Sequence, residues 1–307
     1  MNVAECVGVG TQVLTKAGVE NPRADVEWLL ASCLHTRRMQ LYLDLNRDLN
    51  PAQQGHFETL LTRRAAREPL QHILGTAEFS GRLFEVDRFV LIPRPETELL
   101  AELGVRHVRR RLGLDPKSGP PWRHSRKPFS ALDFGTGSGC LAVTLALEAG
   151  EGSDIQVSAV DISPDAIEVA RRNARRHGCD RVVRFFLGDG FAGLNSTPSS
   201  GPKKFDLILT NPPYIPTREI QALQPEVRDH DPVLALDGGE DGLLFYRRLA
   251  TEALERMNEA GVLMAEFGDG QFERVAGLFR GVGWAVEAPV QDDTGRLRIL
   301  IARPVAS

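Results

Sequence analysis

From residue 130 onward, short apolar runs alternate with stretches of helical pattern, and no other feature of the chain constrains its fold as strongly. The runs, several of them rich in β-branched residues, are 131–134, 156–160, 182–187, 205–210, 262–267 and 284–289. Helical stretches such as 164–177 lie between them, with Ser163 as an N-cap residue. Strands that alternate with helices form a parallel sheet covered on both faces. We therefore predict an α/β fold with a mostly parallel sheet.

The last apolar run, 298–302, follows the run before it after only a short turn that contains Gly295. Parallel neighbours need a crossover of a dozen or more residues, whereas antiparallel neighbours can be joined by a tight turn. We therefore predict that this last strand is antiparallel and lies at the edge of the sheet. The stretch 195–204 is poor in apolar residues and predicts a solvent loop.

The first 75 residues have the pattern of a small helical domain. Asn21 and Asn50 each stand directly before a proline, which favours a helix start at both places, and Asn2 predicts a further cap. Ser80-Gly81 between apolar residues indicates a hairpin in 76–92, and a helix then opens and runs to about residue 112. We predict three parts: a helical domain over 1–75, a hairpin linker over 76–95 and the α/β domain over 96–307.

Charge is distributed unevenly along the chain, although the net charge is only −4. The segment 106–127 holds a single acidic residue, Asp115, and eight basic ones: Arg106, Arg109, Arg110, Arg111, Lys117, Arg123, Arg126 and Lys127. A protein that grips duplex phosphate is expected to be basic over a broad face. We therefore expect nucleic acid not to be the main partner, and we interpret the basic segment as a solvated helix end and loop.

Composition disfavours several other classes of protein. No apolar run reaches the ~18 uncharged residues that span a membrane, and the N-terminus lacks the pattern of a signal peptide. The cysteines lie too far apart in sequence for a zinc site or a redox pair: Cys6, Cys33, Cys140 and Cys179. We expect a cytoplasmic protein with no metal and no membrane partner, and we expect a monomer.

Glycines alternate with other residues directly after the first of the predicted strands, in the sequence DFGTGSG at 133–139. Glycine lets a backbone pass close to a ligand and turn sharply into a helix. Cys140 stands where the third glycine of a dinucleotide fingerprint belongs, and no Gly-Lys-Ser/Thr is present, so NAD and nucleoside triphosphates are disfavoured. Taken alone, this loop fits a ligand site and a plain strand-to-helix turn equally well.

Acidic residues end the next two strands. Asp161 follows the glycine loop by about 20 residues, where a carboxylate can accept both hydroxyls of a ribose. Its alternative role is to cap the following helix, but Ser163 already fills it. Asp189 could accept from an adenine amine or could simply stabilise a turn. Because open α/β sheets bind ligands at the carboxyl ends of their strands, both acids are candidate cofactor-binding residues.

The most specific motif is Asn211-Pro212-Pro213-Tyr214, directly after the run 205–210. Two prolines stiffen the backbone, and a residue before proline is held extended. The corner therefore presents the Asn211 side-chain oxygen, the Pro212 carbonyl and the Tyr214 ring as one rigid unit. Two acceptors suit a planar –NH₂ group, and a ring face suits a flat π-system. We predict Asn211, Pro212 and Tyr214 as the catalytic residues, and no general base is evident.

Together these motifs resemble the class I S-adenosylmethionine-dependent methyltransferases that act on planar amino nitrogens. Further segments narrow the resemblance: NPRADVEWLLA (21–31), EPLQHILG (68–75), IPRPETE (92–98), DGGEDGL (237–243), EFG (266–268) with Gln271, and a DxGxxR sequence ending at Arg298. Over nearly its whole length the chain is similar to the peptide chain release factor glutamine methyltransferase family. The resemblance implies a Rossmann-like sheet and methyl transfer from S-adenosylmethionine to a glutamine side-chain amide nitrogen of a release factor.

The resemblance also implies roles for individual residues. The methionine part of the cofactor would lie against Gly135, Thr136, Gly137, Ser138 and Gly139. Asp161 would hold the ribose, and Asn211 would stand between cofactor and substrate. The pocket for the glutamine amide would consist of Asn211, Pro212, Pro213 and Tyr214. Residues 1–75 would form the domain that recognises the release factor.

The chain departs from the family pattern in two places. Gly190 follows Asp189 where members often carry an aromatic residue, so Phe191 is a candidate substitute beside the adenine, and the basic insertion 109–127 is longer than usual. Three alternatives stay open: a ribosomal-protein glutamine methyltransferase, a methyltransferase for exocyclic amines of nucleic acids and a non-catalytic binding module. The motif at 92–98 argues against a ribosomal-protein methyltransferase. The acidic charge outside 106–127 argues against a nucleic-acid methyltransferase, and the intact site motifs argue against a non-catalytic module.

Overall fold

The computed structural model describes residues 1–114, 128–150, 154–195 and 204–305. The chain divides into two compact units. The helical unit comprises Met1–Thr76 together with Leu223–His230, and the sheet unit comprises Ala77–Ala222 together with Asp231–Ser307. A short stretch from the second half of the chain thus belongs with the N-terminal helices, which no sequence pattern indicates.

Helix caps in the helical unit follow from local sequence. Its elements are α1 (Val3–Lys16), α2 (Pro22–Cys33), the 3-10 turn η1 (Arg38–Leu43), α3 (Pro51–Ala65), α4 (Leu70–Leu74) and α8 (Pro225–Arg228). Asn2 and Glu5 form a reciprocal capping box on α1, as predicted. Asn50 and Gln53 form another on α3. Asn21 precedes α2 as expected, but its side chain makes no capping hydrogen bond.

A close crossing of α1 and α2 organises the core of the helical unit. Gly10 lies at the crossing, because a methyl group there would come within 2.9 Å of Val26. Around this point Leu14, Leu30 and Phe57 are buried. Interiors pack so densely that one additional methyl group must displace a neighbour, so the small residue at position 10 permits the close approach.

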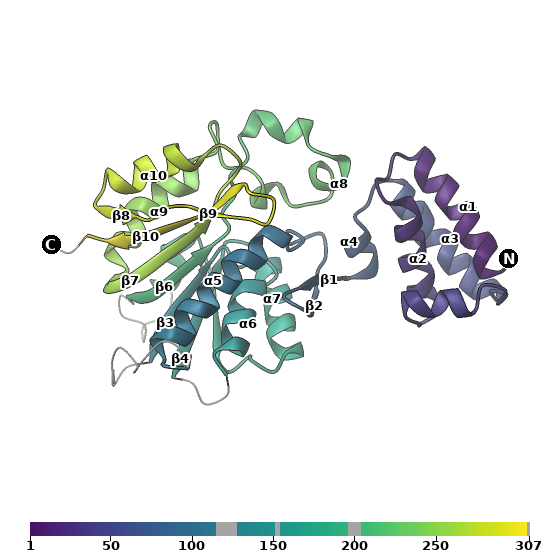
Figure 1. Cartoon of the computed structure of the whole chain (residues 1–307), viewed down its shortest axis with the longest axis horizontal. Helices are drawn as coiled ribbons and strands as arrows, with labels where there is room; N and C mark the ends of the chain where they lie inside the picture. The colour runs from purple at the N-terminus through teal and green to yellow at the C-terminus, as the bar shows by residue number, and fades with distance from the viewer. Residues whose placement is uncertain (115–127, 151–153, 196–203, 306–307) are drawn as a thin grey trace. The chain divides into compact units, whose positions relative to one another are not determined.

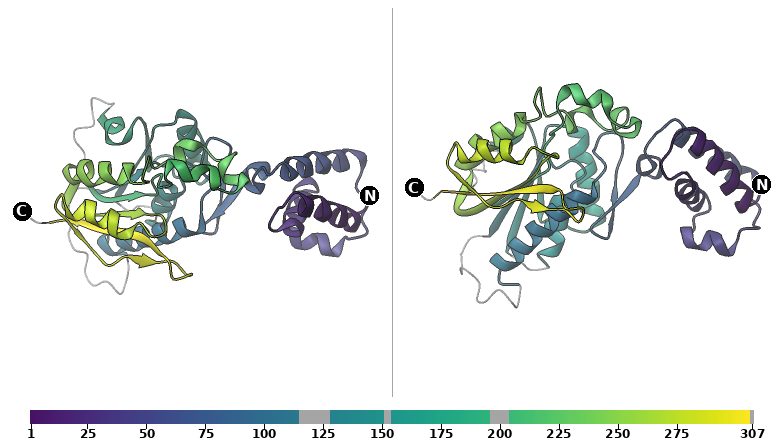
Figure 2. Two further views of the ribbon diagram at one scale, coloured as in Figure 1. Left: turned by 90° about the horizontal axis from the view of Figure 1, so that it is seen from above. Right: turned by 45° about the horizontal axis from the view of Figure 1, so that its top comes forward.

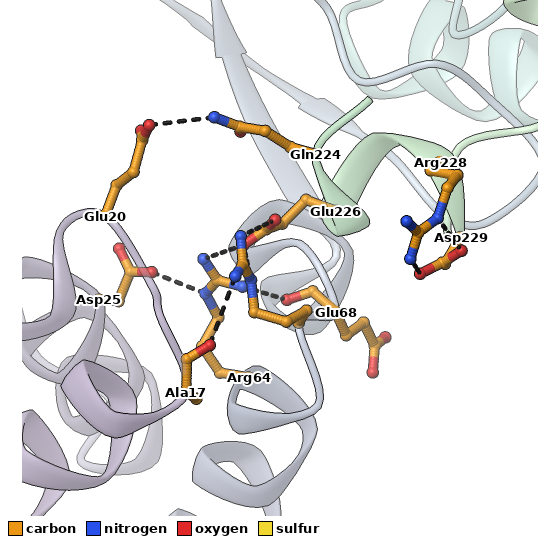
Figure 3. A network of polar contacts seen from close by, with 10 residues as sticks. Ala17, Glu20, Asp25, Arg64, Glu68, Gln224, Glu226, Arg228 and Asp229 are labelled. Carbon is orange, nitrogen blue, oxygen red and sulfur yellow. Dashed lines mark hydrogen bonds and ion pairs between the residues drawn. The ribbon is translucent and has the colours of Figure 1, made fainter. Parts of the chain in front are cut away.

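An ion-pair cluster joins α8 to the end of α3 within the helical unit (Figure 3). Glu226 accepts hydrogen bonds from Arg64 Nη2 at 3.0 Å and from Arg67 Nε and Nη2 at 2.6 and 2.5 Å. Arg64 is buried and also donates to Asp25 at 2.7 Å. Burial opposes ionisation of Glu226, but the hydrogen bonds from Arg67 and Arg64 outweigh it and lower its pKa to about 2. Charge pairing therefore holds Leu223–His230 in this unit.

The elements of the sheet unit fall close to their predicted positions. Its strands are β1 (Thr76–Phe79), β2 (Arg82–Glu85), β3 (Phe129–Phe134), β4 (Ile155–Asp161), β5 (Val183–Leu187), β6 (Phe205–Thr210), β7 (Met257–Glu266), β8 (Trp284–Val286), β9 (Val290–Gln291) and β10 (Leu297–Pro304). Its helices are α5 (Pro95–Arg111), α6 (Cys140–Glu148), α7 (Pro164–Arg176), α9 (Leu244–Glu255) and α10 (Phe272–Arg280), with the 3-10 turns η2 (Gly190–Asn195), η3 (Thr217–Ala222) and η4 (Val233–Ala235). β1 and β2 form the predicted hairpin, which turns at Ser80-Gly81.

The main sheet has the strand order β5-β4-β3-β6-β7-β10-β8, with β9 paired to β10. Strands β3 to β7 pair in parallel, and β10 runs antiparallel to β7, as predicted. The prediction that this last strand lies at the edge is wrong, because β10 lies between β7 and β8. The physical reason is strand pairing: β8 and β9 pair with β10 on the side away from β7, so both backbone edges of β10 are hydrogen-bonded within the sheet.

Helices cover both faces of this sheet (Figures 1 and 2). α5, α6 and α7 lie on one face, where Leu145 of α6 and Leu207 of β6 belong to the same buried cluster. α9 and α10 lie on the other, where Tyr246 and Phe279 pack with Leu263 of β7. The predicted Rossmann-like α/β sheet with an antiparallel last strand and an N-terminal helical region is therefore confirmed.

Parts of two predicted surface segments fall outside the described residues. They are 115–127 of the basic segment 106–127 and 196–203 of the predicted solvent loop. Arg109, Arg110 and Arg111 close the last turn of α5, where positive charge interacts favourably with the helix dipole. Within the described part of the chain, no helix combines the length and apolar character that crossing a bilayer requires.

Candidate active site

A pocket opens at the carboxyl edge of the parallel strands of the sheet unit. The predicted site residues that line it are Gly135, Thr136, Gly137, Ser138, Asp161, Asp189, Asn211, Pro212 and Pro213. Gly139 and Tyr214 are not among the lining residues in the described part of the chain. The topology thus gathers most of the predicted residues from four strand ends into one cavity.

The glycine loop makes its turn between β3 and α6 with backbone angles that favour glycine. Gly135, Gly137 and Gly139 have φ values of +74°, +52° and +81°. A methyl group at Gly139 would also lie 3.0 Å from the Cβ of Ala170 in α7. The last glycine of the loop therefore serves the close packing of α6 on α7, which accounts for its place outside the pocket wall.

Asp133, in the strand before the loop, hydrogen-bonds to the loop and to the start of α6. Its Oδ2 accepts from Thr136 Oγ1 at 2.7 Å and from Ala142 N at 3.1 Å. Its Oδ1 is buried and has no hydrogen-bond partner among the described residues. Burial raises the pKa of Asp133 to about 7, against the lowering effect of these two hydrogen bonds.

Asp161 joins the end of β4 to the glycine loop. Its Oδ2 accepts from Gly137 N and its Oδ1 from Ser163 N, both at 2.9 Å. Ser163 itself caps α7 by accepting from Ala166 N at 3.2 Å. Burial raises the pKa of Asp161, and the backbone hydrogen bonds oppose that shift. Each carboxylate oxygen retains further lone-pair capacity at the pocket wall.

Asp189, two residues after the end of β5, also lines the pocket. Its Oδ1 is paired with Arg248 Nη1 at 2.7 Å, and the side chain is more than half exposed. Phe191 lies in the core, where its ring centroid is 5.0 Å from that of Phe134. Phe134, not Phe191, reaches the pocket wall, so the suggestion that Phe191 replaces the usual aromatic residue at this place is not supported.

Asn211 is oriented by a hydrogen-bond chain that reaches two other elements. Its Nδ2 donates to Thr97 Oγ1 at 3.0 Å, and Thr97 Oγ1 donates to Glu266 Oε2 at 2.7 Å. Thr97 belongs to the first turn of α5, and Glu266 is the last residue of β7. Among the described residues, Asn211 Oδ1 has no hydrogen-bond partner, so it is the acceptor that this side chain offers at the pocket.

The backbone after the two prolines is held by contacts that leave little space. Tyr214 O accepts from Gln271 Nε2 at 2.9 Å, and Gln271 Oε1 accepts from Gly268 N at 3.0 Å. A methyl group at Gly242 would collide with the same Tyr214 carbonyl. Burial raises the pKa of Tyr214 to about 12, which keeps its hydroxyl neutral. The segments around 237–243 and 266–271 therefore pack against the Asn-Pro-Pro-Tyr corner and restrict its backbone.

Sequence reasoning missed several residues of the pocket. Phe89 and Ile162 line it and are 38% and 54% exposed. Thr97 lies inside the motif at 92–98, but nothing in that motif shows which residue its hydroxyl contacts. The available signal for Ile162 is its position directly after Asp161 at a strand end.

Comparisons with known proteins agree with this geometry. Residues 5–75 match the family model described as the PrmC N-terminal domain, and residues 126–266 match that of a methyltransferase domain. The release factor glutamine methyltransferase of Geobacter sulfurreducens is 44% identical over 292 residues, which cover 94% of this chain and 92% of that protein. The chain belongs to the release factor glutamine methyltransferase family. The member from Deinococcus radiodurans is 38% identical over 303 residues, 99% of each chain.

Solved structures extend the comparison to the fold of this methyltransferase. The hMettl16 catalytic domain, in complex with MAT2A 3′UTR hairpin 6, has a TM-score of 0.51 and 15% sequence identity. The match covers 81% of this chain and 82% of that chain. At such low identity the likeness shows the fold alone, and that fold is the predicted class I methyltransferase sheet.

Proposed function

We propose that this methyltransferase transfers a methyl group from S-adenosylmethionine to the side-chain amide nitrogen of a glutamine in a peptide chain release factor. Family membership supports the proposal, and one observation carries it. Asn211 Nδ2 donates its hydrogen bond to Thr97, so Asn211 Oδ1 is available as an acceptor at the pocket. An acceptor there suits the –NH₂ of a carboxamide. The predicted cytoplasmic location is consistent with a release factor as the substrate.

The residues of the pocket fit the proposed cofactor. Phe89 and Ile162 form an apolar wall that suits an adenine ring, and the Asp161 carboxylate suits the two ribose hydroxyls. The loop Gly135–Gly139 lets backbone atoms approach the methionine part, and Asp189 would accept from the adenine amine. When bound, this cofactor supplies a methyl group on a sulfonium centre, a strong electrophile.

The task of the protein is to align and stabilise a poor nucleophile. An amide nitrogen reacts sluggishly because its lone pair is delocalised into the carbonyl group. We assign Asn211 Oδ1 and the Pro212 carbonyl as acceptors for the two amide protons. These hydrogen bonds strengthen as positive charge develops on nitrogen, which stabilises the transition state more than the bound substrate. The nitrogen then loses a proton, to water or to an accepting carbonyl.

Tyr214 keeps its proposed place as the ring that covers the amide plane. The ring lies beside Gly268, where an added methyl group would approach it to 3.0 Å. The absence of a side chain at Gly268 therefore leaves room for the ring. Stacking of Tyr214 on the substrate stays a prediction.

We propose that the helical unit recognises the release factor. Large apolar side chains are exposed on α2 and η1: Trp28, Met39 and Leu43 are 45%, 76% and 84% exposed. Exposed apolar surface often marks a protein-binding site. The predictions of a monomer and of a substrate other than nucleic acid stay predictions.

The decisive experiment supplies labelled S-adenosylmethionine and offers release factor, ribosomal protein, DNA and rRNA in separate reactions. Mass mapping then locates the methyl group. We expect a single methyl on a glutamine of the release factor and methylation slower by about 10²–10³ with the Asn211→Ala variant. A methyl group on a ribosomal protein or on a base would replace the proposal with one of the alternatives.

A further inference from the structure

Asn211, Thr97 and Glu266 form a relay, a chain of hydrogen bonds that runs from the pocket wall, which Asn211 and Thr97 line, to the buried Glu266. Thr97 and Glu266 are 3% and 2% exposed, and neither atom of the Thr97–Glu266 bond faces solvent. Asn211 directly follows β6, Thr97 lies in α5 and Glu266 ends β7, and the three are separated by more than 50 positions in sequence. Only Asn211 belongs to the proposed catalytic set, so the relay needs a separate explanation.

The direction of each hydrogen bond in the relay follows from counting protons. An ionised carboxylate has no proton to give, so Glu266 can only accept from the Thr97 hydroxyl. A hydroxyl carries a single proton, so Thr97 Oγ1, having donated, can only accept from the Asn211 amide. The Nδ2 end of Asn211 must therefore face inward, and Oδ1 is left for the pocket.

Protonation of Glu266 allows both hydrogen bonds of the relay to reverse. A neutral Glu266 can donate to Thr97, and Thr97 can then donate to Asn211 Oδ1. The two ends of an asparagine amide have nearly the same shape, so no packing contact opposes this half-turn. Nδ2 would then point at the pocket, where its protons would face the protons of the substrate amide.

We propose that Glu266 and Thr97 are positioning residues that set which end of Asn211 faces the substrate: the acceptor when Glu266 is ionised and the donor when it is neutral. This inference rests on the proposed function, because the distinction matters only for a substrate that presents an –NH₂ group. It assigns a role to the motifs at 92–98 and 266–268 that their sequence does not reveal.

The surroundings of Glu266 shift its pKa into a pH range in which the enzyme can be assayed. Burial raises its pKa to about 7, and the hydrogen bond from Thr97 opposes the shift. The charged and titratable groups that face it are Arg94 and Glu96 near the start of α5, Tyr214 after β6, Tyr246 of α9, which donates to its backbone carbonyl, and Arg298 of β10. Because the ionised fraction of Glu266 grows as pH rises through 7, activity should rise over the same interval.

Thr97→Val tests the relay with almost no change of volume. The variant removes the hydroxyl that orients Asn211, so we expect kcat to fall about 10-fold or more, a larger effect than any change in cofactor affinity. Thr97→Ser should restore most of the activity. Thr144→Val is the matched control, because Thr144 is also buried and its hydroxyl has no partner among the described residues. Equal kcat in Thr97→Val and Thr144→Val would overturn the proposal.

Glu266→Gln tests the switch itself. A glutamine cannot titrate, so the rise of kcat/KM through pH 7 should disappear in this variant. An unchanged pH profile would overturn the proposal. If the variant does not fold, nuclear magnetic resonance of the wild type decides: the Asn211 side-chain amide protons, assigned by their loss in Asn211→Ala, should shift with a midpoint near pH 7 and should not shift if the relay is fixed. This measurement needs no substrate, so it separates failure of the relay from failure of the proposed function.

Discussion

Asp161 Oδ2 lies 2.9 Å from the backbone nitrogen of Gly137, so the acid that ends β4 holds the glycine loop that follows β3. The two strands are parallel neighbours, and their carboxyl ends meet at the pocket. One carboxylate thus shapes the loop and also faces the cavity. The proposed contacts to methionine and to ribose are therefore coupled through a single side chain.

Asp161→Ala should weaken cofactor binding about 10- to 100-fold, because hydrogen bonds to a charged group contribute about 1.5–3 kcal/mol each. Isothermal titration with S-adenosylmethionine measures the dissociation constant. Asp165→Ala removes an exposed acid from the first turn of α7 and serves as the control. Similar affinities in the two variants would contradict the proposed ribose contact.

Asn211→Ala should lower kcat/KM on release factor by about 10²–10³, the scale of losing one charge-stabilising group at a transition state. Because the loss is of an acceptor for the substrate amide, most of the effect should be in kcat. Steady-state kinetics with a cofactor-binding measurement checks both points. Near-normal turnover with normal cofactor binding would remove Asn211 from the catalytic set.

Tyr214 should act through its ring and not through its hydroxyl. Tyr214→Phe keeps the ring and should retain most activity, whereas Tyr214→Ala should lower kcat/KM by about 10-fold, since aromatic contacts contribute about 0.5–1.5 kcal/mol beyond their area. Kinetics of both variants on release factor decides the matter. An equal loss of kcat/KM in Tyr214→Phe and Tyr214→Ala would indicate that Tyr214 acts through its hydroxyl and not through stacking of its ring.

Asp133 should make stability depend on pH. Burial raises its pKa from 3.8 to about 7, so the folded state holds a proton that the unfolded state has released. The stabilisation is complete below pH 3.8 and is lost as pH rises through 7. Asp133→Asn should therefore gain about 1–3 kcal/mol over wild type at pH 8, and the gain should shrink toward pH 4. Denaturant unfolding at several pH values measures this, and a pH-independent difference would contradict it.

Glu226 should contribute to the stability of the helical unit. Glu226→Ala removes the hydrogen-bonded acid of Arg67 and leaves Arg64 paired with Asp25, so we expect a loss of about 1–3 kcal/mol. With its pKa lowered to about 2, the wild-type contribution is present above pH 4.5 and is lost only as pH falls toward 2.

Denaturant unfolding of the full chain near pH 7 measures the effect of Glu226→Ala. Glu219→Ala is the control, because Glu219 is exposed and lies 3.8 Å from its arginine partner. A similarly small effect in both variants would show that the cluster contributes little.

Much of the fold could be predicted because its signals are local. Glycines at 135, 137 and 139 occur where φ is positive, and the capping box at Asn2 needs only residues of one helical turn. The two prolines after β6 stiffen a corner whatever surrounds it. Such features depend on backbone sterics within a few residues, so a sequence displays them directly.

Other predictions failed or were absent because they depend on neighbours far apart in the chain. Phe191 follows a strand end as expected, yet it points into the core beside Phe134. β10 is antiparallel as predicted but lies inside the sheet, because β8 pairs with it on the side opposite β7. The local pattern of apolar residues predicts neither the place of Phe191 nor that of β10.

The sequence by itself determined the kinds of element, the alternation that makes a parallel sheet and the residues that end each strand. Only the tertiary structure decided that Glu266 and Thr97 stand behind Asn211 and that Glu226 reaches Arg64 and Arg67 within the helical unit. The physical reason is range: local sterics act along the backbone, whereas a hydrogen-bond relay or an ion-pair cluster exists only once strand order and packing have brought distant segments together.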